Sequence, residues 1–191
     1  MKKAISENYT KINYILTKAF VNNKSVNYVL KQKKEKYISR LMDYSLYQGE
    51  KFGDIFLNEE ETACAILIDH KIKKTTSGTF IQDIKFACCI SGLKNAHKVI
   101  KKERITHETL PKNMNFIQLW FLGVDVLQQG KGKGSGFLQE IIEYYKGKKE
   151  AIVLETSTMQ NITFYEKNGF KIYGVNKDDF GFDFYFFIYK Y

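Results

Sequence analysis

The feature that most constrains the fold is a series of four segments between residues 115 and 155. Asn115–Val126 (NFIQLWFLGVDV) is almost wholly apolar, as expected of a strand buried on both faces. A glycine-rich stretch follows at Gln128–Gln139 (QQGKGKGSGFLQ), and from Phe137 apolar residues recur at helical spacing. Ala151–Glu155 is another short apolar strand. Strand, loop, helix and strand form a right-handed crossover, so we expect two parallel strands in an α/β fold with a mixed sheet.

Hydrophobic periodicity predicts further elements on both sides of this unit. The expected helices are Ser6–Ala19, Val26–Leu46, Phe80–Ile105 and one that runs through Tyr165 and ends at Gly169. The expected strands are Asp54–Leu57 and Thr62–Asp69, joined as a hairpin at NEEE, and two aromatic-rich strands near the C-terminus. We expect the last of these, within FGFDFYFFIYKY, to be covered on both faces. Because no repeat or Pro-rich linker divides the chain, we expect one domain over residues 1–191.

The charge of the chain argues against specific nucleic-acid binding. The net charge is +9, but only two of the 30 basic residues are arginine, and the lysines are spread along the whole chain. Arginine is the residue that makes bidentate contacts to phosphate and guanine. The composition therefore favours solvated lysine faces, and we expect no specific nucleic-acid partner.

The apolar segments and the cysteines point to a cytoplasmic protein without metal. No apolar run is long enough to cross a bilayer, and none follows the N-terminal lysines as in a secretory signal, so we expect no membrane partner. Cys64, Cys88 and Cys89 lack the spacing of a zinc site. We expect all three to be reduced, buried and structural.

The glycine-rich stretch is typical of a phosphate-binding loop. The Walker pattern fails because Lys133 is followed by Gly134, and the dinucleotide fingerprint fails because its third glycine is missing. What remains is Q-x-x-G-x-G, which starts at Gln129, follows a buried strand and precedes a helix. The first N–H groups of a helix have no intrahelical partner and carry partial positive charge, so such a loop can bind phosphate.

A second motif indicates which kind of phosphate-binding loop this is. Leu154–Phe170 reads LETSTMQNITFYEKNGF, and together with the glycine loop it resembles the GCN5-related N-acetyltransferase (GNAT) superfamily. The resemblance covers Asn115–Tyr173, about a third of the chain. Within the superfamily, the sequence of these residues is most similar to the branch that includes puromycin N-acetyltransferase. It implies a GNAT fold with about six to seven strands, flanking helices and a splayed parallel pair. Gln129 stands where many members carry Arg, and Lys133 where an apolar residue is usual.

The same resemblance implies which residues bind acetyl-CoA. The pyrophosphate would lie on the loop formed by Gln129, Gly130, Lys131, Gly132, Lys133, Gly134 and Ser135. Backbone groups near Val124 and Val126 would pair with the pantetheine, and Asn161 would bond its amides or cap the helix.

For catalysis, Tyr165 matches the family's general acid. A phenol with a pKa near 10 can protonate a thiolate whose conjugate acid has a pKa near 8.5. Glu155, at the end of its strand, is the candidate base or substrate contact; a water chain or an already neutral amine would serve equally. Gln118 lies near where some relatives place a catalytic glutamate. We expect all three histidines to be surface residues, namely His70, His97 and His107.

These implications define a first hypothesis for function. The chain would be an acetyl-CoA-dependent N-acetyltransferase, without metal, that acts on a primary amine of a small molecule as a monomer or homodimer. Because neither motif holds a cysteine, we expect direct transfer in a ternary complex. The alternatives are a protein or peptide amine as acceptor, a CoA-binding regulatory module without turnover, and a nucleic-acid binder.

Overall fold

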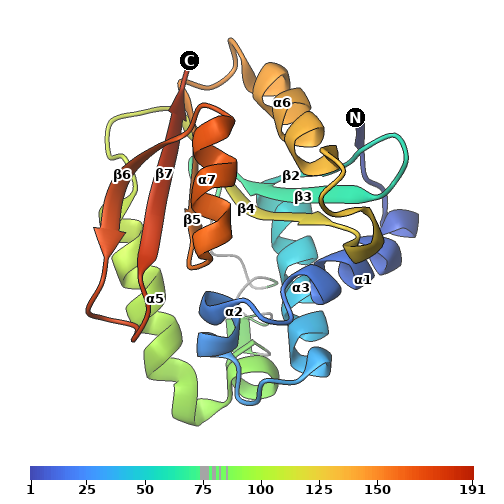
Figure 1. Ribbon diagram of the computed structural model, residues 1–191. Helices are drawn as coiled ribbons and strands as arrows, with labels where there is room; N and C mark the ends of the chain where they lie inside the picture. The colour runs from blue at the N-terminus through green and yellow to red at the C-terminus, as the bar shows by residue number, and fades with distance from the viewer. Residues whose placement is uncertain (74–77, 79–80, 82, 85) are drawn as a thin grey trace.

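A seven-stranded mixed sheet forms the centre of the computed structural model, which describes residues 1–73, 78, 81, 83–84 and 86–191. Its order is β1-β2-β3-β4-β5-β7-β6, and among the paired strands only β4 and β5 run parallel. The strands are β1 Lys2–Lys3, β2 Gly53–Leu57, β3 Ala63–Ile68, β4 Phe116–Val124, β5 Ala151–Thr156, β6 Lys171–Asn176 and β7 Phe184–Lys190. The predicted α/β class, mixed sheet and parallel pair are confirmed (Figure 1).

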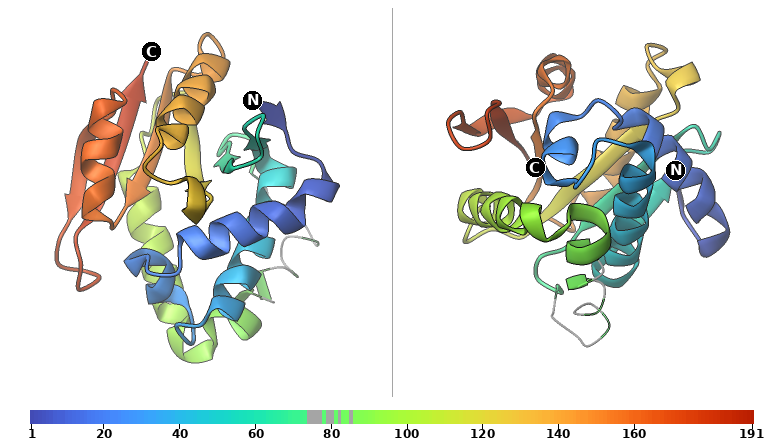
Figure 2. Two further views of the ribbon diagram at one scale, coloured as in Figure 1. Left: turned by 45° about the vertical axis from the view of Figure 1, so that its right-hand side comes forward. Right: turned by 90° about the horizontal axis from the view of Figure 1, so that it is seen from below.

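Helices cover both faces of this sheet. The α-helices are α1 Tyr9–Ala19, α2 Lys24–Val29, α3 Glu35–Phe52, α5 Ala96–Thr109, α6 Lys133–Tyr145 and α7 Met159–Lys167. Short 3₁₀ segments are η1 Ser6–Asn8, η3 Leu93–Asn95 and η4 Val126–Gln128, and η2 Phe86–Ser91 is a π-helix. Apolar residues of α6 and α7 pack on one face, and those of α1 and α3 on the other. Figure 2 shows α2 and α5 together at the lower end of the molecule, where the two helices are in contact.

The predicted helix Val26–Leu46 is wrong as a single element. Helix α2 ends at Val29, and Leu30 is extended, with φ −80° and ψ 143°. The N–H of Lys31 donates to the carbonyl of Ile90, and the Asn95 side chain donates to the carbonyl of Leu30. These tertiary hydrogen bonds replace the helical ones, so the chain starts a new helix only at Glu35.

The predicted helix Phe80–Ile105 is also interrupted. Gly92, which follows the π-helix, has φ +72°, a positive value that glycine adopts readily, and α5 starts only at Ala96. The part of this prediction that falls on Phe80, Gln82 and Lys85 lies outside the described residues.

The predicted hairpin and the predicted strand at the C-terminus are confirmed. Strand β2 pairs with β3 around the NEEE turn, and β7 is paired on both sides, with β5 and with β6. Of the cysteines, Cys64 is buried as expected, but Cys88 and Cys89 are exposed. The prediction for that pair is wrong because the π-helix turns its neighbour Ile90 into the core instead.

Candidate active site

Strands β4 and β5 are hydrogen-bonded to each other only at their start. Their pairing covers three positions and ends at Gln118 opposite Val153. Beyond that point β4 stays paired with β3 as far as Val124, and β5 stays paired with β7 as far as Thr156. Each strand therefore presents unpaired backbone groups to the gap between them, and such groups need a partner when they are shielded from water. This gap is the splay between the parallel strands that the family resemblance implies.

A β-bulge at Trp120 changes which side chains of β4 share a face. Leu119 pairs with Leu67 and Phe121 pairs with Ile66, so Trp120 has no partner on β3. A bulge of this kind shifts the alternation of side chains by one residue. As a result Leu119 packs with α6, whereas Trp120 and Phe121 both pack with α1 and α3.

The glycine loop ends in the first turn of α6, which starts at Lys133. Gly130 and Gly132 both have φ +77°, and a Cβ built on either would meet nothing within 4 Å. In the described part of the chain, no backbone N–H from Gln129 to Ser135 donates to another protein group. Free N–H groups, open space and the positive end of a helix together fit an anion such as pyrophosphate.

Both lysines of the loop contact other protein groups. The Lys131 Nζ donates to the carbonyl of Leu127 at 2.9 Å. The Lys133 Nζ lies 2.7 Å from Glu60 Oε2, in the turn between β2 and β3. The positive charge of Lys133 is therefore balanced by Glu60.

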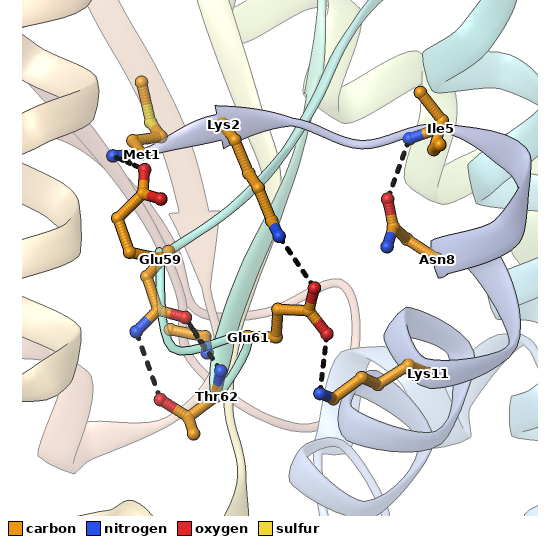
Figure 3. Close-up of polar contacts among 10 residues, drawn as sticks. Met1, Lys2, Ile5, Asn8, Lys11, Glu59, Glu61 and Thr62 are labelled. Atoms are coloured by element: carbon orange, nitrogen blue, oxygen red, sulfur yellow. Dashed lines mark hydrogen bonds and ion pairs between the residues drawn. The ribbon is translucent and has the colours of Figure 1, made fainter.

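The other glutamates of that turn are held by the N-terminal segment (Figure 3). The amino group of Met1 lies 2.8 Å from Glu59. Glu61 accepts hydrogen bonds from Lys2 and Lys11, each at 2.7 Å, and these bonds lower the pKa of its carboxyl to about 2, with that of Lys11 contributing most. The turn is thereby fixed beside the glycine loop.

The remaining predicted coenzyme residues lie around the same edge. The Gln129 side chain donates to the carbonyl of Val124 at 3.1 Å, and Val126 is 46% exposed in η4. The Asn161 side chain donates to Thr156 Oγ1 at 3.2 Å, and it is not the N-cap of α7, which is Thr158. Asn161 thus stabilises the turn between β5 and α7.

Gly134 and Ser135 connect α6 to its neighbours. A Cβ on Gly134 would lie 3.3 Å from Val124 and 3.5 Å from Phe164, so a glycine allows α6 to approach β4 and α7 closely. The Ser135 hydroxyl accepts a hydrogen bond from the Asn168 side chain at 3.3 Å. Both residues therefore position the start of α6.

A cavity of about 910 Å³, the central cavity, lies against the gap. Its described lining includes Gln118, Glu155, Thr156, Asn161 and Tyr165. Gln118 and Glu155 occupy the face of the sheet that carries Phe116 and Val153, whereas Tyr165 packs with the α6 and α7 cluster on the opposite face. Side chains from both faces line one cavity because the strands between them have separated.

A chain of hydrogen bonds joins three strands at this point. His70 follows β3, and its Nε2 lies 2.6 Å from the Gln118 Oε1. The Gln118 Nε2 donates to the Glu155 Oε2 at 2.8 Å. Because the amide nitrogen donates to the carboxylate, the amide oxygen must accept from His70, so Nε2 carries a proton and the neutral ring keeps its lone pair on Nδ1.

Burial shifts the pKa values of these groups. Desolvation raises the pKa of the Glu155 carboxyl, while the charge of Lys102 and the hydrogen bond from Gln118 oppose the shift. Desolvation lowers the pKa of His70, which favours the neutral ring. Desolvation raises the pKa of the Tyr165 phenol, and the charge of Glu155 raises it further. The Glu155 carboxylate therefore disfavours ionisation of the Tyr165 phenol.

The structure corrects one prediction about the histidines. His97 and His107 are exposed, as expected, but His70 is half-buried and bonded to Gln118. The position of His70 in the sequence indicates this burial, because His70 lies two residues beyond Ile68, the last residue of β3, and so continues its face. Ile68 is opposite Gln118 in the sheet.

The residues that the structure describes contain no group of three or more His, Cys, Asp or Glu side chains that could hold a metal ion. None of their helices combines the length and the apolar character needed to cross a membrane.

Comparison with known proteins finds the same fold among solved structures. No protein-family model and no curated protein sequence matches the chain. Among solved structures, the chain is similar to "histone acetyltransferase HPA2 and related acetyltransferase" from Corynebacterium glutamicum, with a TM-score of 0.69 and 17% identity over 98% of this chain and 93% of that one.

Two further structures have the same architecture. An N-acetyltransferase from Staphylococcus aureus Mu50 gives a TM-score of 0.57 at 18% identity, covering 99% of this chain and 96% of that one. The C-terminal condensation domain of Ebony, in complex with β-alanyl-dopamine, gives a TM-score of 0.67 at 10% identity, covering 100% of this chain and 97% of that one. At these identities the likeness establishes a shared fold, and the predicted GNAT fold is confirmed.

Proposed function

We propose that the protein is an acetyl-CoA-dependent N-acetyltransferase that acetylates a primary amine of a small molecule by direct transfer in a ternary complex. One observation carries the proposal: β4 and β5 separate after Gln118 and Val153, beside a glycine loop with free N–H groups and against a cavity that contains a carboxyl and a phenol. The gap offers backbone groups to an extended ligand, and the loop offers N–H groups to its phosphates.

In this proposal the chain holds acetyl-CoA, the co-substrate that supplies the acetyl thioester, at two places. The N–H groups from Gln129 to Ser135 bind the pyrophosphate, with Lys131 and Lys133 as the nearest positive charges. The open edge of β4 near Val124 and Val126 binds the pantetheine, and Asn161 supports it from the other side of the gap.

Glu155 and Tyr165 would carry the proton transfers. The amine nitrogen attacks the thioester carbonyl carbon, the new C–N bond forms and the C–S bond breaks. Glu155 accepts the proton that leaves the nitrogen, and Tyr165 donates a proton to the departing sulfur. Glu155 becomes neutral in this process, which removes one cause of the high Tyr165 pKa at the moment when the phenol must give up its proton.

Direct transfer is supported by the lining of the cavity. Among the described residues that line it there is no cysteine that could carry an acetyl group.

The names of the structural neighbours point to two kinds of acceptor, since one neighbour is a histone acetyltransferase and another is in complex with β-alanyl-dopamine. We base the choice of a small-molecule acceptor on the cavity, which has a volume of about 910 Å³ and is bordered by helices α2, α3 and α5.

The test is release of CoA thiol from acetyl-CoA in the presence of amines, including puromycin, for the wild type and Tyr165→Phe. We expect the substitution to lower kcat by roughly 10²- to 10⁴-fold, the usual contribution of a general acid, and to leave the Kd for CoA unchanged. Tyr185→Phe, the same loss of a hydroxyl at a residue outside the cavity lining, is the matched control. Tight CoA binding without turnover on any amine would instead identify a regulatory module.

A further inference from the structure

Aromatic side chains line the part of the central cavity between α3, η2 and β4. Tyr44 lies 4.9 Å from Phe86 and 6.3 Å from Trp120, measured between ring centroids, and Trp120 lies 5.1 Å from Phe121. Tyr44, Phe86 and Trp120 are only partly buried, although they pack against the core. Their remaining ring surface faces the cavity and is available to a ligand.

Among the described residues that line the cavity, two buried side-chain oxygens have no partner, on Thr106 of α5 and on Gln48 of α3, and the second belongs to this part of the cavity. Gln48 lies one turn after Tyr44 on α3, is 3% exposed, and lines the cavity. Its Oε1 is buried and accepts no hydrogen bond in the described part of the chain. A buried amide oxygen left unpaired is unfavourable, so a ligand that brings an N–H or O–H donor to Gln48 would bind better than one that does not.

The charges around the cavity disfavour a polycation. The described lining has three carboxylates, Asp83, Glu103 and Glu155, and three basic groups, Lys73, Lys102 and Arg104. Asp83 already accepts the hydroxyl of Tyr44 at 2.7 Å. A polyamine would need an excess of free carboxylates, which this lining does not supply.

The spacing along β4 sets the length of the ligand. Gln118, which holds Glu155, and Trp120 are two residues apart on one strand, or about 7 Å at the usual rise of 3.3 Å per residue. The alternation of side chains along the strand places Trp120 on the face where Gln118 lies, and the bulge adds Phe121 to that face. An amine nitrogen beside Glu155 and a ring beside Trp120 would therefore be joined by a short alkyl chain.

We propose that the acceptor is an arylalkylamine, a primary amine on a short alkyl chain whose aromatic ring carries a hydrogen-bond donor. This inference rests on the proposed acetyltransferase function. The amine lies at Glu155, the ring lies among Tyr44, Phe86 and Trp120, and the donor on the ring reaches the Gln48 oxygen.

The first experiment compares kcat/KM for acetyl transfer to tyramine, 2-phenylethylamine, 2-cyclohexylethylamine, spermidine and a lysine peptide. We expect phenylethylamine to exceed its cyclohexyl analogue roughly 3- to 10-fold, because aromatic pairs contribute beyond their buried area. We expect tyramine to exceed phenylethylamine by about tenfold, and Gln48→Met to abolish that second difference.

The second experiment changes the aromatic wall. Trp120→Leu should raise the KM for phenylethylamine about tenfold while the Kd for CoA changes less than twofold, and Trp120→Phe should restore most of the loss. Phe182→Leu, an aromatic residue outside the cavity lining, is the control. A preference for spermidine or the lysine peptide, or equal rates with the cyclohexyl amine, would overturn the inference and leave the acetyltransferase function intact. If no amine is acetylated, both fail.

Discussion

Two glycines at opposite ends of α6 allow the proposed phosphate site to be tested against a matched control. Gly132 precedes the helix with φ +77°, and Gly147 follows it with φ +74°. A Cβ on either would meet no protein atom within 4 Å. The helix between them has 13 residues and is about 20 Å long, so an alanine at one end cannot contact a ligand at the other.

Alanine at either position should destabilise the fold by a similar amount. The left-handed conformation is unfavourable for a residue with a Cβ by about 1–2 kcal/mol, which lowers the Tm of a chain of this length by roughly 2–8 °C. Only Gly132→Ala places a methyl group where the phosphates would bind. Loss of one charge-assisted hydrogen bond, about 1.5–3 kcal/mol, would weaken CoA binding roughly 10- to 150-fold.

Calorimetric titration with CoA and thermal unfolding of both variants check this expectation. Gly147→Ala should bind CoA like the wild type despite its lower Tm. The reasoning is refuted if Gly132→Ala keeps the wild-type Kd, or if both variants lose affinity equally, because the loop would then not contact the coenzyme or the loss would reflect stability alone.

Two further predictions concern charge. Burial raises the pKa of Glu155 above its ordinary value, and the carboxylate is the basic form, so kcat/KM should fall as the pH drops through that raised pKa. Glu155→Gln keeps an acceptor for Gln118 but should lower kcat by roughly 10²- to 10⁴-fold and remove this acidic limb from the pH profile. If the acidic limb persists in the variant, Glu155 is not the base. Glu60→Gln frees Lys133 from its ion pair and should tighten CoA binding by about 1.4- to 5-fold in a titration at low salt. Glu59→Gln makes the same change in the same turn, where the carboxylate pairs with Met1, and should not tighten binding. Equal effects of the two substitutions would mean that only the net charge of the turn matters.

The sequence predicted best the elements whose structure depends on local pattern. The apolar run at Asn115–Val126 and the glycine loop specify β4 and the start of α6 through burial and backbone freedom alone. The break after Val29 was missed because it depends on hydrogen bonds from Lys31 to Ile90 and from Asn95 to Leu30, between residues about 60 positions apart. No periodicity within the segment records such contacts.

The same distinction applies to the candidate site. The glycine loop and the Asn161–Tyr165 motif are each contiguous in the sequence, so their residues could be named beforehand. The His70–Gln118–Glu155 chain joins residues that are 48 and 37 positions apart. It depends on the register in which Ile68 is opposite Gln118 and Gln118 is opposite Val153, which only the assembled sheet defines.

The register also explains how a carboxyl and a phenol from opposite faces of the sheet come to line one cavity. Glu155 lies on the face of β5 that carries Val153, and Tyr165 approaches from the helices on the other face. In a continuous sheet the backbone of the two strands would separate them. The pairing of β4 with β5 stops at Gln118, and two residues later the bulge at Trp120 alters the course of β4. In the proposed enzyme, the opening that would admit an extended ligand is therefore the same opening that exposes Glu155 and Tyr165 to one cavity, so binding and proton transfer would depend on a single feature of the sheet.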